Sequence, residues 1–313
     1  MRSRPVLRTV LVAAGLALSL AACGKSDPPA GQQTGETHPV AHAMGTTEVP
    51  LTPQRVVVLD TDKLDTAVTL GITPVGAAVA DQTGLPSYLG DAVGTVQVVG
   101  TLTEPDLEAI EGLDPDLILG TKFRQEQFYD ELSAIAPTVF TEKVGITWKE
   151  NFLLDGEALG KKDTAADLLG AYEQRAKTVG EDIDGAAELE VGIVRFMPDH
   201  IRVYGPDSFS GIVVGDAGLD RPEFQKLDGA EDKRFAKVSQ EKIDDADGDV
   251  LFYCAYGADA TAALEEVTGG SLWKGMSAVE DGKAYTVNDE VWMTGIGVTA
   301  ANMILDDLAA KLK

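Results

Sequence analysis

Blocks of apolar residues alternate with amphipathic stretches along most of the chain, and this pattern predicts strands and helices in turn. Short runs rich in Val, Ile and Leu predict buried strands at residues 55–59, 75–79, 96–99, 117–119, 138–140, 191–196, 201–204, 250–253 and 284–287. Apolar residues at helical spacing predict helices at residues 64–70, 107–112, 123–135, 211–217, 260–267 and 299–312. Alternation of this kind predicts mostly parallel sheets covered by helices.

The segment 149–184 differs from its surroundings. It has no Pro and no β-branched run, and its apolar residues follow a helical rhythm, so we expect one long helix that starts near Asp163. The predicted division is an N-terminal α/β lobe at 46–160, an interlobe helix at 161–186 and a C-terminal α/β lobe at 187–313. The expected fold class is therefore α/β, with two Rossmann-like lobes joined by one long α-helix.

The N-terminal segment has the features of a secretory signal. Three Arg precede an apolar run that is shorter than the roughly 20 residues of a membrane-spanning helix. Leu20, Ala21, Ala22 and Cys23 resemble the lipobox of bacterial lipoproteins, which implies removal of residues 1–22 and lipid on Cys23. Residues 23–45 are rich in Pro, Gly and polar residues, so we expect a flexible tether. The expected location is extracytoplasmic, anchored to the cell membrane.

Charge and composition exclude several functions. The chain carries 26 Lys and Arg against 51 Asp and Glu, a net charge of −25, which opposes binding to nucleic acids and anionic lipid surfaces. Cys254 lies in an apolar run and is expected to be a buried, unpaired thiol. His38 and His42 fall in the predicted tether, leaving His200 in the folded part, so no metal site built on clustered His is expected.

Enzymatic patterns are weak. Asp60 and Asp62 follow an apolar strand, an arrangement similar to that of haloacid-dehalogenase-like phosphatases, but Asp also caps helices that follow strands. Gly295, Gly297 and Ala300 match a dinucleotide signature without the strand that should precede it. We therefore expect a binding protein and not an enzyme, and a secreted phosphatase that uses Asp60 and Asp62 remains the enzymatic alternative.

A short acidic sequence pattern occurs once in each half of the chain. Glu108 and Asp116 precede one apolar strand, and Glu241 and Asp249 precede another in the same order. Both copies predict a short helix with a Glu in its first turn, which the helix dipole alone would favour.

The ordered set of motifs is similar to substrate-binding proteins of ferric-siderophore ABC importers. The segments are RVVVLDTDKLDTAVTLGI, EPDLEAIEGLDPDLILG, FYDELSAIAPTVF, the long helix and WKGMSAVEDGKAYTVNDEVW. The resemblance implies a ligand cleft between the lobes and iron held by the siderophore, with no cofactor and no protein metal site. It also implies an ABC permease dimer with its ATPase as partner, a monomeric binder, and Glu108 and Glu241 as the permease-docking residues.

The same resemblance places Arg124 and Arg195 in the cleft, where Arg can donate to two ligand oxygens at once. An Arg inside an apolar strand could instead form a buried ion pair, and this alternative stays open for Arg195. The aromatic candidates to cover the ligand are Trp148, Tyr204, Phe209, Tyr256 and Trp292.

The charge of the ligand is predicted from the number of cleft arginines. Two arginines in an acidic chain favour a ferric hydroxamate over a triscatecholate. Citrate or carboxylate types stay open, because Lys122, Lys143 or Arg202 could raise the positive count. Cobalamin and haem are the alternative ligands of the same fold.

Overall fold

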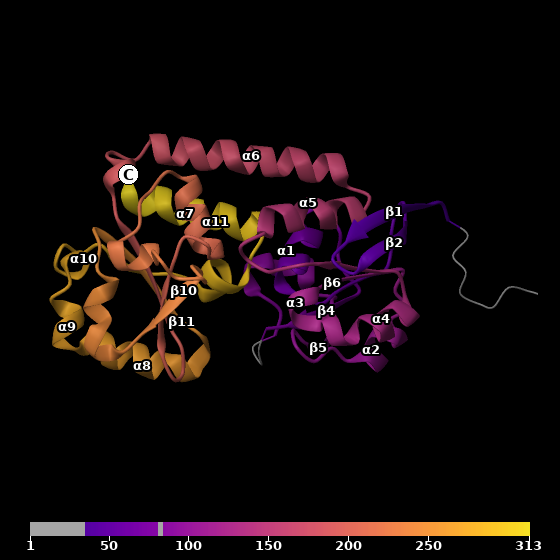
Figure 1. The fold of residues 1–313 in the computed structure, drawn as a ribbon, viewed down its shortest axis with the longest axis horizontal. Helices are drawn as coiled ribbons and strands as arrows, with labels where there is room; N and C mark the ends of the chain where they lie inside the picture. The colour runs from indigo at the N-terminus through magenta and orange to yellow at the C-terminus, as the bar shows by residue number, and fades with distance from the viewer. Residues whose placement is uncertain (1–34, 81–83) are drawn as a thin grey trace, which may run out of the picture. The chain divides into compact units, whose positions relative to one another are not determined.

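The fold is described by a computed structural model that covers residues 35–80 and 84–313 (Figure 1). The predicted signal segment, Cys23 and the first part of the predicted tether lie outside these residues. Within them, no helix combines the length and apolarity needed to cross a membrane.

The N-terminal lobe is built on a parallel sheet with strand order β5-β4-β3-β6-β7. Its strands are β3 (Val56–Val58), β4 (Gly76–Val79), β5 (Gln97–Thr101), β6 (Leu117–Thr121) and β7 (Thr138–Thr141). Its helices are α1 (Thr61–Thr69), α2 (Leu107–Gly112), α3 (Lys122–Gln125), α4 (Tyr129–Ile135) and α5 (Trp148–Ala158). β3, β6 and β7 are buried along their whole length, as expected for strands covered by helices on both faces.

The C-terminal lobe has a mixed sheet with strand order β10-β9-β8-β11-β12. Its strands are β8 (Val191–Phe196), β9 (Ile201–Tyr204), β10 (Phe235–Val238), β11 (Val250–Ala255) and β12 (Ala284–Thr286). Its helices are α7 (Phe209–Asp216), α8 (Gly257–Gly269), α9 (Ser271–Lys274), α10 (Ser277–Glu280) and α11 (Val298–Leu312). β9 pairs antiparallel with both β8 and β10, and β10 is a strand that the sequence pattern did not predict.

One long helix, α6 (Lys162–Glu181), joins the two lobes by packing against α5 on one side and against α7 and α11 on the other (Figure 1). The α/β fold with two lobes and a long linking helix is thus confirmed. The predicted long segment divides into two helices, because Gly160 takes a left-handed conformation with φ +66° between α5 and α6. A Cβ at this position would lie 2.2 Å from the Leu51 carbonyl oxygen, so the turn requires glycine.

The predicted tether ends earlier than residue 45. β1 (Thr37–His42) pairs with β2 (Gly45–Pro50) as an antiparallel hairpin that packs on the N-terminal lobe. Ala43 N donates to the Phe140 carbonyl oxygen at 2.9 Å, and the His42 ring lies 5.9 Å from the Tyr129 ring. Placing His38 and His42 in a tether was therefore wrong: the hairpin gains its order from the lobe and from its own ladder, which polar composition does not reveal.

Asp65 of α1 fixes the start of α11. Its two carboxylate oxygens accept hydrogen bonds from the backbone N–H groups of Thr299 and Ala300, each at 3.1 Å, and from the Tyr88 hydroxyl at 2.8 Å. Gly297 permits this approach, because a Cβ there would lie 2.2 Å from Asp65 Oδ1. The final helix of the chain is thereby capped by a side chain of the N-terminal lobe.

This cap predicts a pH dependence of stability. Burial raises the pKa of Asp65 to about 6, although its hydrogen bonds from Tyr88 and the backbone act in the opposite direction. The folded state therefore holds the proton more tightly than the unfolded state, and the contribution of this group to stability falls as the pH rises through 6. We expect the free energy of unfolding of wild type minus that of Asp65→Asn to fall by up to roughly 3 kcal/mol between pH 4 and pH 7. Urea unfolding of both proteins across this range checks the sign, and a difference that grows with pH would contradict the assignment.

Candidate ligand-binding site

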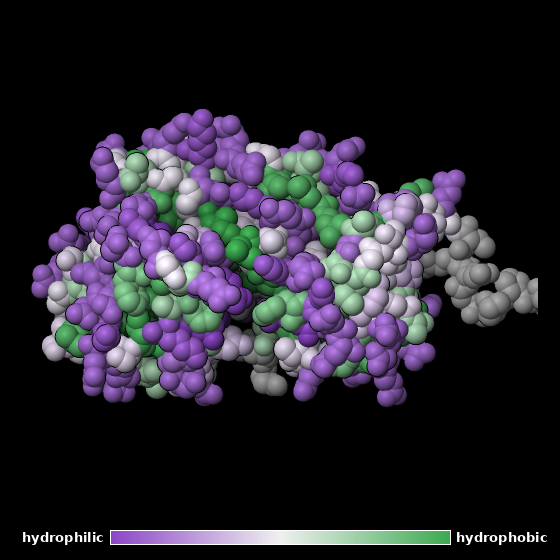
Figure 2. Space-filling model, in the orientation of Figure 1, coloured by the Kyte–Doolittle hydropathy of each residue, from purple (hydrophilic) through white to green (hydrophobic). Residues whose placement is uncertain are grey.

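The candidate site is a cavity of about 310 Å³ whose wall combines residues that follow strands of both sheets. Thr61 follows β3 and Ala80 follows β4 in the N-terminal lobe; Met197 follows β8 and Tyr256 follows β11 in the C-terminal lobe. Open α/β sheets bind ligands outside the carboxyl ends of their strands, so the topology alone favours this place. Hydrophilic residues cover most of the face seen in Figure 2, and hydrophobic residues gather beneath α6.

Four arginines line this cavity, twice the number predicted. They are Arg124, Arg195, Arg202 and Arg234. Asp207 is the carboxylate that lines it with them in the described residues. An acidic chain thus presents a positively charged wall in its cleft, where guanidinium groups can donate to ligand oxygens in pairs.

Arg195 combines both of the roles considered for it. It lines the cavity, and it also forms a bidentate ion pair with Asp289, with Nε–Oδ1 at 2.5 Å and a second bond at 2.6 Å. Burial disfavours its charge, but the hydrogen bonds that it donates to Asp289, together with the nearby groups Tyr204, Asp289 and Cys254, raise the pKa of Arg195 overall. The Tyr256 ring centroid lies 4.4 Å from the guanidinium carbon, which adds a cation–π contact. The ion pair with Asp289 therefore offsets the cost of burying the charge of Arg195 in a strand, and Arg195 still lines the cavity.

Arg124 reaches the cavity from α3 and is held by Asp60, with Nε 2.7 Å from Asp60 Oδ2. Asp60 is fully buried, and it accepts hydrogen bonds from Thr61 N at 2.8 Å and the Thr121 hydroxyl at 3.2 Å. Burial raises the pKa of Asp60 while Arg124 acts to lower it. The carboxylate considered as a phosphatase nucleophile is thus enclosed within the lobe.

Asp62, the second carboxylate of that alternative, belongs to a buried charge cluster centred on Lys63. Lys63 Nζ lies 3.0 Å from Asp62, 2.9 Å from Asp155 and 2.8 Å from the Thr141 hydroxyl. Burial lowers the pKa of Lys63, but the attraction of Asp155 and Asp62 is larger and the net shift is upward. Both carboxylates of the DxD pattern therefore serve ion pairs inside the lobe.

Three of the five aromatic candidates line the cavity: Tyr204, Phe209 and Tyr256. Phe235 lines it as well, and Phe123 does so from the opposite lobe with 60% of its surface exposed. These rings give the arginines an apolar background on which a ligand body can rest.

The prediction that Trp148 and Trp292 line the cleft was wrong. Trp148 is 2% exposed and packs edge-on against Tyr172 and Phe209, with ring centroids 5.2 and 5.5 Å away. Trp292 is fully buried, stacks on Phe252 at 4.6 Å and donates its indole N–H to Asp307 at 2.7 Å. The neighbours Met293, Thr294 and Ile296 face the cavity instead. Full burial removes the largest apolar area from water for a large aromatic ring, and both tryptophans lie in the hydrophobic core.

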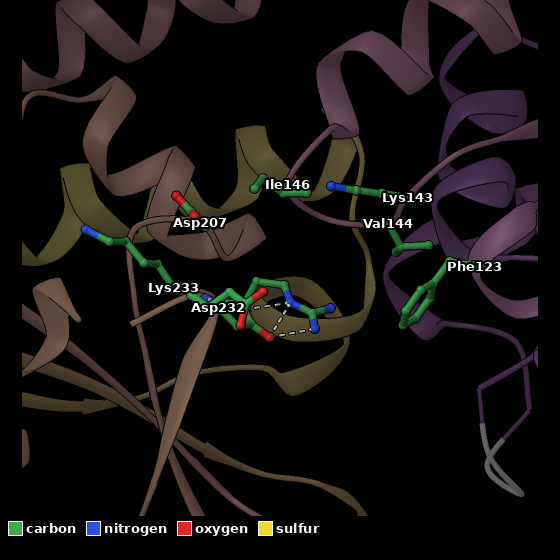
Figure 3. A pocket seen from close by; sticks show the side chains of 9 residues that line it. Phe123, Lys143, Val144, Ile146, Asp207, Asp232 and Lys233 are labelled. Carbon is green, nitrogen blue, oxygen red and sulfur yellow. Dashed lines mark hydrogen bonds and ion pairs between the residues drawn. The ribbon is translucent and has the colours of Figure 1, made fainter. Parts of the chain in front are cut away.

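A second cavity of about 240 Å³ adjoins the first and shares Phe123, Val144, Asp207 and Arg234 with it (Figure 3). Its wall also includes Lys143, which the sequence offered as a further cleft cation; Lys122 lines neither cavity and lies 3.3 Å from Glu142. Arg234 donates a hydrogen bond to Asp232, and its guanidinium carbon lies 5.8 Å from the centroid of the Phe123 ring. Sequence reasoning missed Arg234, because it precedes the unpredicted strand β10 in a polar segment.

The repeated acidic residues occupy equivalent places in the two lobes. Glu108 lies in the first turn of α2, and Glu241 lies in the first turn of the 3₁₀ helix Gln240–Ala246; both are exposed. The Asp of each repeated pattern has a structural role. Asp116 accepts from Arg55 N at 2.9 Å just before β3, and Asp249 accepts from Glu190 N at 2.8 Å just before β8.

Comparison with known proteins decides the family. A model of the periplasmic binding protein family matches residues 56–291, most of the chain. The chain belongs to this family. The resemblance to substrate-binding proteins of ferric-siderophore importers is thereby confirmed, and the family and the relatives below are binding proteins.

This binding protein is similar to three siderophore-binding proteins over most of their length. It is 40% identical to "Probable siderophore-binding lipoprotein YfiY" of Bacillus subtilis, covering 92% of each chain. It is 30% identical to the "Achromobactin-binding periplasmic protein" of Dickeya dadantii, covering 82% of this chain and 86% of that one. Its fold matches Staphylococcus aureus SirA complexed with staphyloferrin B with a TM-score of 0.78 and 32% identity, over 88% and 98% of the two chains. The names of these relatives support an extracytoplasmic location.

Among the described residues, no group of three or more His, Cys, Asp or Glu side chains is arranged to hold a metal ion. Cys254 is buried and free, as expected, and burial raises the pKa of its thiol.

Proposed function

We propose that this binding protein captures a ferric siderophore in the cleft and delivers it to an ABC permease. The four arginines that line the cavity carry the proposal, because they place positive charge inside a chain of net charge −25. Siderophore-binding relatives that share most of their length with this chain support the same ligand class.

The number of arginines in the cavity also changes the predicted type of siderophore. Two arginines favoured a hydroxamate, whereas four favour an anionic complex whose carboxylate oxygens accept paired hydrogen bonds from guanidinium groups. We therefore propose a carboxylate-type ferric siderophore, with an anionic triscatecholate as the second candidate and ferric hydroxamate as the third.

Fluorescence titration tests this proposal. Trp148 lies directly behind Phe209, which lines the cavity, so a ferric complex bound there should quench Trp148 by energy transfer. The panel is ferric citrate, ferric staphyloferrin B, ferrioxamine B, ferric enterobactin, haem and cobalamin. We expect saturable quenching by a ferric carboxylate and weaker binding of ferrioxamine B. Quenching by haem or cobalamin alone would favour the alternative ligands, and no quenching by any ferric complex would overturn the proposal.

Delivery requires a membrane anchor and a permease contact. We propose lipid attachment at Cys23, anchoring the protein to the cell membrane, and docking through Glu108 and Glu241 as a monomer. The two exposed glutamates lie at equivalent places in the two lobes and could meet cationic residues of two permease subunits. Their substitution is treated in the Discussion.

A further inference from the structure

Arg202 differs from the other three arginines of the cavity in its charge environment. Each of the others faces a carboxylate: Arg124 lies 2.7 Å from Asp60, Arg195 lies 2.5 Å from Asp289 and Arg234 lies 2.8 Å from Asp232. In the part of the chain that the structure describes, Arg202 has no ion-pair partner. Its guanidinium lies over the Phe235 ring at 4.4 Å, and its Nε lies 2.9 Å from His200 Nε2. Arg202 therefore brings to the cavity a positive charge that no protein carboxylate balances.

The bond between Arg202 and His200 fixes the protonation of the imidazole. Arg can only donate hydrogen bonds, so His200 Nε2 must accept and must carry no proton. The single ring proton is then on Nδ1, which lies 2.6 Å from Asp199 Oδ1 and donates to it. His200 is thus neutral in this arrangement, with its tautomer set by Asp199 on one side and Arg202 on the other.

We propose that Arg202 is the residue that recognises the negative charge of the ligand, and that His200 and Asp199 are the positioning residues that hold its guanidinium at the cavity. This inference rests on the proposed function, since it names the group that selects an anionic ferric complex. The three carboxylate-bound arginines supply directed hydrogen bonds, while Arg202 supplies the uncompensated charge.

Cationic residues surround Arg202, so its position depends on the acceptor that His200 provides. Arg195 on β8 and Lys237 on β10 both lie opposite Arg202 in the register of the sheet. Asp199 is the acidic group beside His200, with its side chain 82% exposed, and Asp289 is already bound to Arg195. Removal of the His200 acceptor would leave the Arg202 guanidinium beside these two cations, in contact with the Phe235 ring. Affinity for an anionic ligand should then fall, because Arg202 is no longer held at the cavity.

Nuclear magnetic resonance tests the geometry without any ligand. The chain has three histidines, so long-range ¹⁵N–¹H spectra of the full-length folded protein can resolve His200. We expect the Nδ1–H tautomer at pH 7.5 and a slowly exchanging Arg202 Nε–H that exchanges faster in His200→Ala. An Nε2–H tautomer, or exchange of Arg202 Nε–H unchanged in His200→Ala, would overturn the positioning role.

Ligand binding tests the recognition role, with ferric citrate as the anionic probe and ferrioxamine B as the cationic one. Arg202→Gln should lower the affinity for ferric citrate by about 10- to 100-fold, the range that corresponds to a hydrogen bond to a charged group. The affinity for ferrioxamine B should be unchanged. The matched control is Lys237→Gln, which removes an exposed cation that lies opposite Arg202 but lines neither cavity. Equal weakening by the two variants, or equal loss for both probes, would overturn the inference.

Variants of His200 separate positioning from general structural damage. His200→Gln can accept from Arg202 and donate to Asp199 at once, so it should keep the wild-type affinity. His200→Ala should weaken the binding of ferric citrate. Equal weakening by His200→Gln and His200→Ala would overturn the role of His200. Failure of the wild type to bind any ferric complex would overturn the proposed function and the role of Arg202 with it, while the resonance experiment decides the arrangement of His200 independently.

Discussion

Replacing Lys63 with Ala is expected to lower the free energy of unfolding by about 3–5 kcal/mol, the cost of breaking a buried ion pair by removing one partner. Lys63 has no exposed surface, and its ammonium is the cation that binds both Asp62 and Asp155. Without it, two buried carboxylates lose their cationic partner. Urea unfolding at pH 8 measures the loss.

A surface pair provides the control for Lys63. Lys122→Ala removes the partner of Glu142, whose side chain is 59% exposed, and should cost less than about 1 kcal/mol. The loss in Lys63→Ala should also shrink at acidic pH, because burial raises the pKa of Asp155 to about 7 and protonation removes its uncompensated charge. Equal losses in the two variants would show that the buried cluster contributes no more than a surface pair.

Combining Glu108→Ala with Glu241→Ala is expected to reduce uptake of the ferric complex by more than about tenfold while the affinity of the protein for the complex is unchanged. Both side chains are exposed and lie outside the two cavities, so the cleft should keep its geometry. Losing one charged partner at an interface costs about 2–5 kcal/mol, so two losses should reduce uptake by more than about tenfold. Uptake of radioactive iron by cells that carry the variant as their sole copy measures the effect.

The matched control removes two other exposed glutamates, one from each lobe. Glu111 lies on α2 with Glu108, and Glu265 lies on α8 of the C-terminal lobe. The double variant Glu111→Ala with Glu265→Ala removes the same charge and should transport normally. If both double variants transport alike, docking does not depend on the position of the charge and the proposed contact is wrong.

Strands and helices with strong hydrophobic patterns could be predicted from the sequence, some to the residue. The bounds of α2, β8 and β9 agree with the prediction: β8 and β9 are apolar strands that are almost entirely buried, and α2 begins after its N-cap Asp106 and buries Ile110. The β1–β2 hairpin and β10 could not be predicted in this way. Their residues are largely polar or half-exposed, and pairing with distant residues gives them their order.

In the candidate site, too, some features could be predicted from the sequence and others could not. Arg124 and Arg195 could be placed in the cleft through the resemblance to ferric-siderophore binding proteins. Their carboxylate partners, Asp60 and Asp289, could not be assigned, because they lie 64 and 94 residues away in sequence and meet the arginines only in the fold. The tryptophans were misplaced for a related reason. Residue type says that an aromatic ring prefers an apolar environment, but it does not say whether the core or a ligand provides it.

The cap that Asp65 provides for α11 has a consequence for the order in which the chain becomes complete. Asp65 meets its backbone donors at a separation of 234 and 235 residues, close to the full length of the folded part. As the chain is synthesised, this carboxylate stays without its α11 donors until the last helix has emerged. Contacts of such long range are slow to form, since a large loop must close first. The cap therefore makes completion of the N-terminal lobe depend on the fifteen-residue helix α11 at the other end of the fold.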